Sequence, residues 1–287
     1  MLSNPITQII EQFAVQMIPT PDAGLDHYWA WQSYDSEGVR FAFFRTYEDL
    51  RDLVARLASR RVSGGKPPSE AQYILAQYHA AYRDLQAALL GVTPEQAERK
   101  PCEEDWPVRT ILAHLLGADI SFYVVVRFAL DQLRGGIAEL GKPTEEEWLA
   151  LAGKDGPALD ALLEGPVAGL QAFLEEHHAR VIDDFASIGA EELDGLSLYW
   201  ENEPYPLRFR LHRFDSHMRQ HTIQIDKTLA ALGLLPIEAG RLLRLIYAAL
   251  GEVEGLLIGM DPEDALPELE LAAAKIKARL AELEGIV

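Results

Sequence analysis

The chain lacks several features that would assign it to a class of protein. Its single cysteine, Cys102, excludes an intramolecular disulfide framework and a cysteine-rich zinc site. So few cysteines are typical of a protein from a reducing compartment. No run approaches 18 apolar residues, because Asp119 and Arg127 interrupt the longest candidate, LGADISFYVVVRFAL, so we expect no membrane span. The first residues, MLSNPITQII, lack the basic start and long apolar run of a signal peptide, and we expect a cytoplasmic protein.

Basic residues are also scarce. The sequence holds 26 Lys and Arg against 45 Asp and Glu, which gives a formal net charge of -19. Without a strongly basic surface to offset phosphate repulsion, we expect neither a nucleic-acid partner nor attachment to anionic membranes. Solvated acidic helix faces that keep the protein soluble explain the acidity. No Ser-His-Asp, P-loop or GxGxxG pattern stands out in the chain.

Helical spacing of apolar residues is the main pattern in the 287-residue sequence. A long predicted helix follows the Gly- and Pro-rich linker at 62–70, and further long helices are predicted at 107–133, 166–185 and 207–232. Four long helices joined by short and extended connections predict an antiparallel four-helix bundle at 69–234. The fold class is therefore mainly α.

The segments on either side of this bundle are predicted as appendages. Within 1–68, an amphipathic helix at 4–18 precedes aromatic and β-branched residues that flank the turn at 35–38, which predicts a β-hairpin and a small α/β appendage. Residues 235–287 predict a C-terminal helical hairpin. The sequence leaves two positions open for this hairpin, one over the bundle and one in a homodimer interface.

Histidines on two of the bundle helices could hold a metal ion. His217 and His221 are four residues apart, which brings their side chains onto one helix face about 6 Å apart along the axis. His114 is the only histidine of the helix at 107–133 and lies among Ile111 and Leu115. A single inward-facing histidine is more often structural, but the three together form a compound pattern.

That pattern resembles the DinB-like (YfiT-like) family of four-helix-bundle metalloproteins, over roughly residues 70–234. The resemblance is carried by Trp106-x7-His114-Leu115 and by His217-x3-His221-x2-Gln224, followed by Leu229 and Gly233. It implies that His114, His217 and His221 bind one divalent ion, zinc or nickel, in a cleft at one end of the bundle. Family members often have Ser after the Trp and a Glu a few residues later, where this chain has Pro107 and Arg109-Thr110.

The resemblance also implies a chemistry. Related proteins use a low-molecular-weight thiol, so we expect metal-dependent thiol S-transfer or isomerisation of a small electrophile. Three neutral imidazoles leave a coordination position open, as in catalytic zinc sites. A metal-dependent hydrolase would use the same histidines, although the sequence identifies no general base for it. The third alternative is a non-catalytic metal-binding or ligand-binding, stress-associated module.

Several residues near the histidines are candidates for supporting roles. Gln224, Asp119 and Asp215 are candidate partners for the imidazole ring nitrogens. Five basic residues lie between positions 208 and 227, and pairing with acids such as Glu201 and Glu203 is slightly favoured for them. Arg213 and Arg219 are the expected exceptions, and both are candidates for contact with a substrate.

Two further predictions concern residues outside the candidate site. His177 and His178 follow Glu175 and Glu176, which predicts a solvated helix face. Cys102 lies in the acidic sequence CEED, where negative charge raises the pKa of a thiol, so we expect no nucleophilic role for it.

Overall fold

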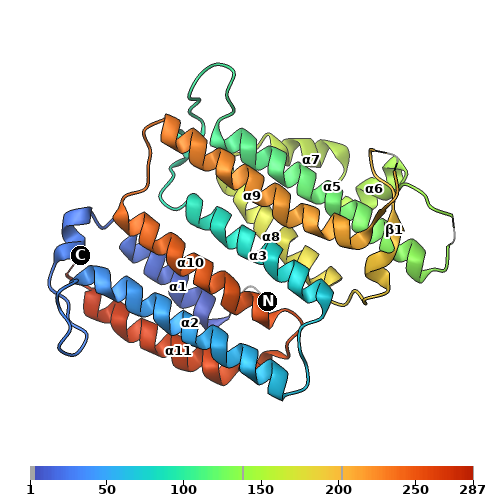
Figure 1. Cartoon of the computed structure of the whole chain (residues 1–287). Coiled ribbons are helices and arrows are strands. Elements are labelled where there is room, and N and C mark those ends of the chain that lie inside the picture. Colours follow the sequence, from blue (N-terminus) through green and yellow to red (C-terminus); the bar gives the residue numbers. More distant parts are fainter. Residues whose placement is uncertain (1–3, 138, 202, 287) are drawn as a thin grey trace. The chain divides into compact units, whose positions relative to one another are not determined.

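The structure is a computed structural model that describes residues 4–137, 139–201 and 203–286. These ranges form eleven α-helices and one small antiparallel sheet, which confirms the predicted mainly α class (Figure 1). The helices are α1 (Pro5–Met17), α2 (Val39–Ser63), α3 (Glu70–Ala88), α4 (Pro94–Ala97), α5 (Val108–Arg134), α6 (Glu145–Ala152), α7 (Gly156–Leu163), α8 (Val167–Phe185), α9 (Leu207–Ala231), α10 (Glu238–Leu257) and α11 (Pro262–Leu283). The sheet pairs β1 (Leu196–Ser197) with β2 (Tyr205–Pro206).

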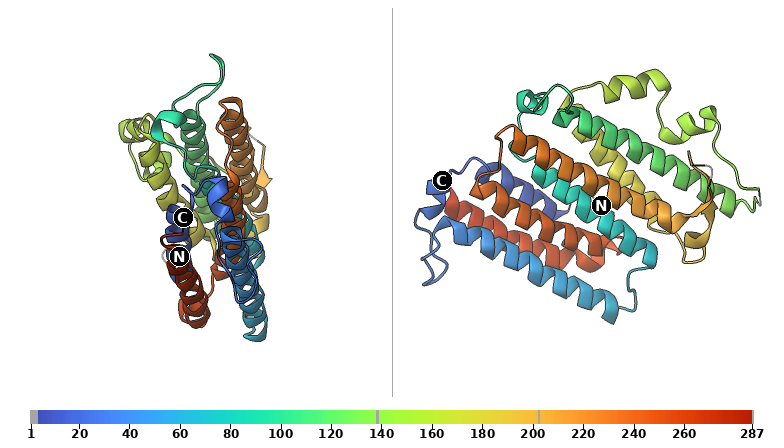
Figure 2. Two further views of the ribbon diagram at one scale, coloured as in Figure 1. Left: turned by 90° about the vertical axis from the view of Figure 1, so that its left-hand side faces the viewer. Right: turned by 45° about the horizontal axis from the view of Figure 1, so that its top comes forward.

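The chain divides into two compact units. The first contains residues 1–68, 79–92 and 234–287, and the second contains residues 69–78 and 93–233. The two segments predicted as separate appendages therefore share one unit, in which α1, α2, α10 and α11 pack around a common apolar core (Figures 1 and 2). Helix α3 contributes to both units, since its first turns belong to the second unit and its later turns to the first.

The predicted β-hairpin of the N-terminal segment is wrong, and this segment is helical. Gly38 does form the predicted turn, with φ of 59°, but it caps the start of α2 rather than joining two strands. Val39, Ala42, Phe43 and Thr46 are all buried, and their spacing is that of one helix face. Among the described residues before α2, strand-like pairing is limited to a single bridge between residues 31 and 34.

The first unit encloses a charged cluster around Glu254. The Arg83 guanidinium donates two hydrogen bonds of 2.6 Å to the Glu254 carboxylate, and His79 Nε2 lies 2.8 Å from it. Thr7 Oγ1 also donates to this carboxylate. Burial alone raises the pKa of Glu254, but the charge of Arg83 and the hydrogen bond from His79 overcome it and lower the pKa to about 2. Glu254 is therefore a buried carboxylate with a full set of partners.

Tyr78 joins the helices of the second unit. Its hydroxyl donates a 2.5 Å hydrogen bond to Asp119 on α5, and its ring lies against His178 on α8 and Phe214 on α9. His177 and His178 are buried, so the predicted solvated face is wrong for them. Burial lowers the pKa of His177 to about 4. The four helices α3, α5, α8 and α9 thus meet around one aromatic and polar centre.

Helix α5 is long and apolar enough to cross a membrane when judged by length and composition alone. Its most apolar window is 61% buried inside the structure, and its buried residues include the ionisable Asp119. That arrangement is typical of the core helix of a bundle. In the second unit, α5 packs against α8 and α9 and supplies one wall of the candidate site.

Candidate metal centre

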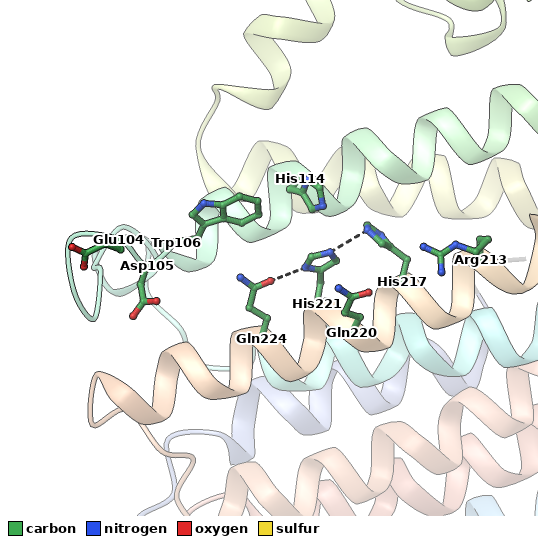
Figure 3. A pocket seen from close by; sticks show the side chains of 9 residues that line it. All are labelled: Glu104, Asp105, Trp106, His114, Arg213, His217, Gln220, His221 and Gln224. Atoms are coloured by element: carbon green, nitrogen blue, oxygen red, sulfur yellow. Dashed lines mark hydrogen bonds between the residues drawn. The ribbon is translucent and has the colours of Figure 1, made fainter. Parts of the chain in front are cut away.

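The three predicted histidines come together in the structure. Helix α9 buries Phe214, Met218 and Ile225, and this orientation turns His217 and His221 toward α5. Helix α5 buries Ile111 and Leu115 and presents His114 from the opposite wall (Figure 3). His217 and His221 are buried, whereas His114 is exposed. The site is therefore built on two packed helices, with one open side.

The distances between the histidines fit a shared metal ion. His217 Nε2 and His221 Nε2 are 3.1 Å apart, and one nitrogen of each histidine lies within 4.8 Å of the other two. Two nitrogen ligands of a tetrahedral zinc ion, each at 2.0–2.1 Å, would stand about 3.3 Å apart. The buried pair already has this spacing, and the exposed His114 side chain is the one with room to adjust.

Gln224 determines how His221 presents its ring. The Nδ1–H group of His221 donates a 2.8 Å hydrogen bond to Gln224 Oε1, which leaves the lone pair of Nε2 facing His217 (Figure 3). His217 differs, because its Nδ1 atom is buried without a hydrogen-bond partner among the described residues. Its ring is held by packing instead, with Phe122 edge-on at 5.4 Å between ring centroids.

Both buried histidines are held neutral. Burial, together with the neighbouring His221, His114 and Arg213, lowers the pKa of His217 to about 3. Burial also lowers the pKa of His221, although the hydrogen bond to Gln224 opposes this shift. A neutral imidazole has the free lone pair that a metal ion requires, so neither residue has to lose a proton at pH 7.

An open pocket of about 460 Å³ leads to the histidines. Trp106 lies over His114, with ring centroids 5.2 Å apart, and forms one wall. The charged residues of the pocket are separated along its length: Glu104 and Asp105 lie at one end and Arg213 at the other, with the histidines between them (Figure 3). The remaining lining residues are Gln220 and Gln224.

The structure separates the other candidate residues into those at the pocket and those elsewhere. Asp119 is not brought to the histidines, because it lies about 140° around α5 from His114 and accepts from Tyr78 on α3. Burial raises the pKa of Asp119 to about 7, and the hydrogen bond from Tyr78 offsets only part of that shift. Asp215 and Arg219 pair with each other at 2.7 Å, and neither lines the pocket. Arg213 is thus the predicted arginine that the structure places there.

Three pocket residues were missed by sequence reasoning. Gln220 stands three residues after His217 and one before His221, so the helical spacing of the metal motif itself could have identified it. Glu104 and Asp105 directly precede Trp106, but only the path of the loop brings them to the pocket. In the same loop, the Cys102 thiol donates to Asp105 at 3.1 Å, and this contact raises the pKa of Cys102 as predicted.

Comparison with known protein families gives one match. Residues 77–225, just over half of the chain, match the model of the DinB superfamily. The matched segment contains all three histidines, Gln224 and the pocket residues described above. Neither the curated proteins nor the solved structures yielded a match.

Proposed function

The chain belongs to the DinB superfamily, and from this premise we propose that it is a metal-dependent enzyme that transfers a small thiol to an electrophile or isomerises the electrophile with its help. The observation that carries the proposal is the convergence of three histidine nitrogens at the base of an open pocket. A closed structural zinc site has four protein ligands, whereas this cluster offers three and an open side.

His114, His217 and His221 would hold the ion, and zinc or nickel is the metal we expect. A divalent ion bound there would supply the positive charge that lowers the pKa of a thiol entering the open position. The nitrogen donors fit both metals, because imidazole is a good ligand for each.

The chain's own residues would position the reactants. Gln224 keeps the His221 ring in one tautomer, and Phe122 packs against the His217 ring, so the two buried ligands are preorganised. Trp106 covers His114 and gives the pocket an apolar wall against which a small electrophile can lie. The thiol would lose its proton to solvent, and its sulfur would form a bond to the electrophilic carbon. In transfer the displaced group would leave with the electron pair of the broken bond, and in isomerisation the same carbon–sulfur bond would break again to release the thiol.

Elemental analysis and a conjugation assay test this proposal. We expect the purified protein to hold about one divalent ion per chain and to accelerate the loss of a thiol in the presence of an aryl chloride. His217→Ala should lose both the ion and the activity while keeping its helical circular dichroism. His212→Ala is the matched control, since His212 is exposed on the same helix and does not line the pocket. Full metal occupancy in H217A would refute the assignment of the ligands.

A second candidate, metal-dependent hydrolysis, is favoured by one feature of the pocket. Glu104 and Asp105 line it, and a carboxylate in that position could act as the general base that hydrolysis requires. The two candidates differ in their dependence on thiol. Ester cleavage without any thiol, lost in Glu104→Gln or Asp105→Asn, would favour the hydrolase, whereas turnover only with thiol present would favour the transferase.

A chelator separates both enzymes from the non-catalytic alternative. Most of the second unit's core is formed by apolar packing that does not involve the histidines. We therefore expect the metal-free protein to stay folded and to rebind metal when it is returned. Unfolding on chelation would instead indicate a structural ion.

A further inference from the structure

Arg213 differs from the other arginines of its helix. Arg208 pairs with Glu70 and Asp194, and Arg219 pairs with Asp215. Arg210 is buried against Glu201, as favoured from the sequence. For Arg213, by contrast, no carboxylate of the described residues lies within ion-pair distance, and its one hydrogen bond to another side chain is a long one of 3.5 Å to Ser216 Oγ.

The position of Arg213 directs its charge into the pocket. The residue is half-buried, and its guanidinium lies 5.6 Å from the ring centroid of Phe122. In Figure 3 the guanidinium of Arg213 points toward His217. It lies four residues before His217 on α9, which is about 6 Å along the helix axis. The pocket therefore places a fixed cation within the reach of any ligand that touches the histidines.

This placement is unfavourable for the metal alone. Like charges repel, so a guanidinium beside three neutral histidines weakens the binding of a divalent cation. Arg213 lies beside a cation site and is unpaired among the described residues, which is explained if the ligand that binds in the pocket carries a negatively charged group.

The opposite end of the pocket fixes where that anion lies. Glu104 and Asp105 would repel a negative group, so an anionic ligand has only the Arg213 end available. A carboxylate matches the planar fork of a guanidinium and carries a single charge. We propose that Arg213 is the specificity-determining residue of this pocket and that the small-molecule ligand bound at the histidines carries a carboxylate. The inference rests on the proposed function for the part played by the metal.

Thiols that differ only in charge test the proposal. The cobalt(II)-loaded protein is titrated with 3-mercaptopropionate and with its uncharged amide, 3-mercaptopropanamide, and the near-ultraviolet absorption of cobalt–sulfur bonding reports each Kd. We expect the carboxylate to bind roughly tenfold more tightly than the amide, as one charge-assisted hydrogen-bonding contact gives. In Arg213→Gln this ratio should fall to about one, with cobalt content unchanged or higher.

Arg219→Gln is the matched control, because it removes an arginine from the same helix that is paired and does not line the pocket. Its ratio should equal that of the wild-type protein. A ratio that persists in R213Q, or that is about one in the wild type, overturns the inference and leaves the proposed function standing.

A separate measurement tests the carboxylate inference if the proposed thiol chemistry is wrong. If the protein holds no cobalt, or if neither thiol changes its spectrum, the thiol chemistry proposed above is wrong. The carboxylate inference is then settled by calorimetry with malonate as the probe. Binding to the wild type that is lost in R213Q supports Arg213 as the anion-binding residue, and equal binding or no binding to either protein overturns it.

Discussion

Replacing Gln224 tests whether the hydrogen bond to His221 prepares the site for metal. Gln224→Ala removes the acceptor that lies 2.8 Å from His221 Nδ1. His221 is only 4% exposed, so water would not replace the amide oxygen freely, and the ring would be free to adopt the tautomer with its proton on Nε2. That tautomer cannot bind a metal through Nε2.

The expected loss is roughly tenfold to 100-fold in metal affinity, which is the usual effect of removing such a partner. This corresponds to about 1.4–2.8 kcal/mol. The lower end matches the free energy of one neutral hydrogen bond, about 0.5–1.5 kcal/mol, and the tautomer change adds to it. Gln224→Glu keeps an acceptor and adds negative charge, so it should bind metal at least as tightly as the wild type.

Competition with a chromophoric chelator at pH 7.5 measures these affinities for zinc. Gln220→Ala serves as the control, because Gln220 lines the same pocket but makes no hydrogen bond to a histidine within the described ranges. Its affinity should stay close to that of the wild type. An affinity of Q224A equal to that of Q220A would refute the argument, as would weaker binding by Q224E than by Q224A.

Three further predictions follow from the buried ionisable groups. Because burial lowers the pKa of His217 to about 3, this residue does not compete with metal for protons between pH 7 and pH 5. Chelator competition should therefore show an affinity that falls by at most about two decades per pH unit, one for each of the other two histidines. Glu254→Gln leaves Arg83 buried without its carboxylate and should cost about 3–5 kcal/mol in urea unfolding, whereas the exposed Glu252→Gln should cost less than about 1 kcal/mol. Burial raises the pKa of Asp119 from 3.8 to about 7, so its contribution to the free energy of unfolding is present below pH 3.8 and is lost as the pH rises to 7. The change amounts to up to ~4 kcal/mol. Asp119→Asn should remove this pH dependence, and parallel stability–pH curves for the two proteins would contradict the prediction.

Helix boundaries were largely predictable because they depend on local residues. The side chain of Asn4 caps α1, which begins within one residue of its predicted start, and α5 begins at Val108, one residue after the predicted start at Pro107. The segment before Thr46 was mispredicted because its aromatic and β-branched residues favour strands, while burial against α10 selects the helical spacing of Val39 and Phe43. Composition is a weaker signal than burial periodicity, and the burying partner lies about 200 residues away in the chain.

The histidine cluster was predictable because the spacing of its residues along two helices can be read from the sequence. His177 and His178 were mispredicted because their sequence neighbours Glu175 and Glu176 are acidic, although each residue turns about 100° from the last on a helix. The buried face runs through Leu174, then His177 and His178 three and four residues later, and then Val181. Contacts made across loops, such as those of Glu104 and Asp105 with the pocket, have no comparable signature in the sequence.

Charge balance in the buried parts of each unit supports the assignment of Arg213. A buried carboxylate here is either paired, as Glu254 is with Arg83, or shifted toward its neutral form, as Asp119 is. An arginine has no neutral form to adopt, because its guanidinium stays protonated at every pH at which the protein is folded. A buried arginine therefore needs a carboxylate or, as Arg61 shows, backbone carbonyl oxygens as acceptors. Buried Arg279 and Arg210 follow the rule and pair with Asp49 and Glu201. Arg213 is half-buried, faces an open pocket and lacks such a partner among the described residues, so we expect an anion from solution to pair with it in the pocket beside the histidines.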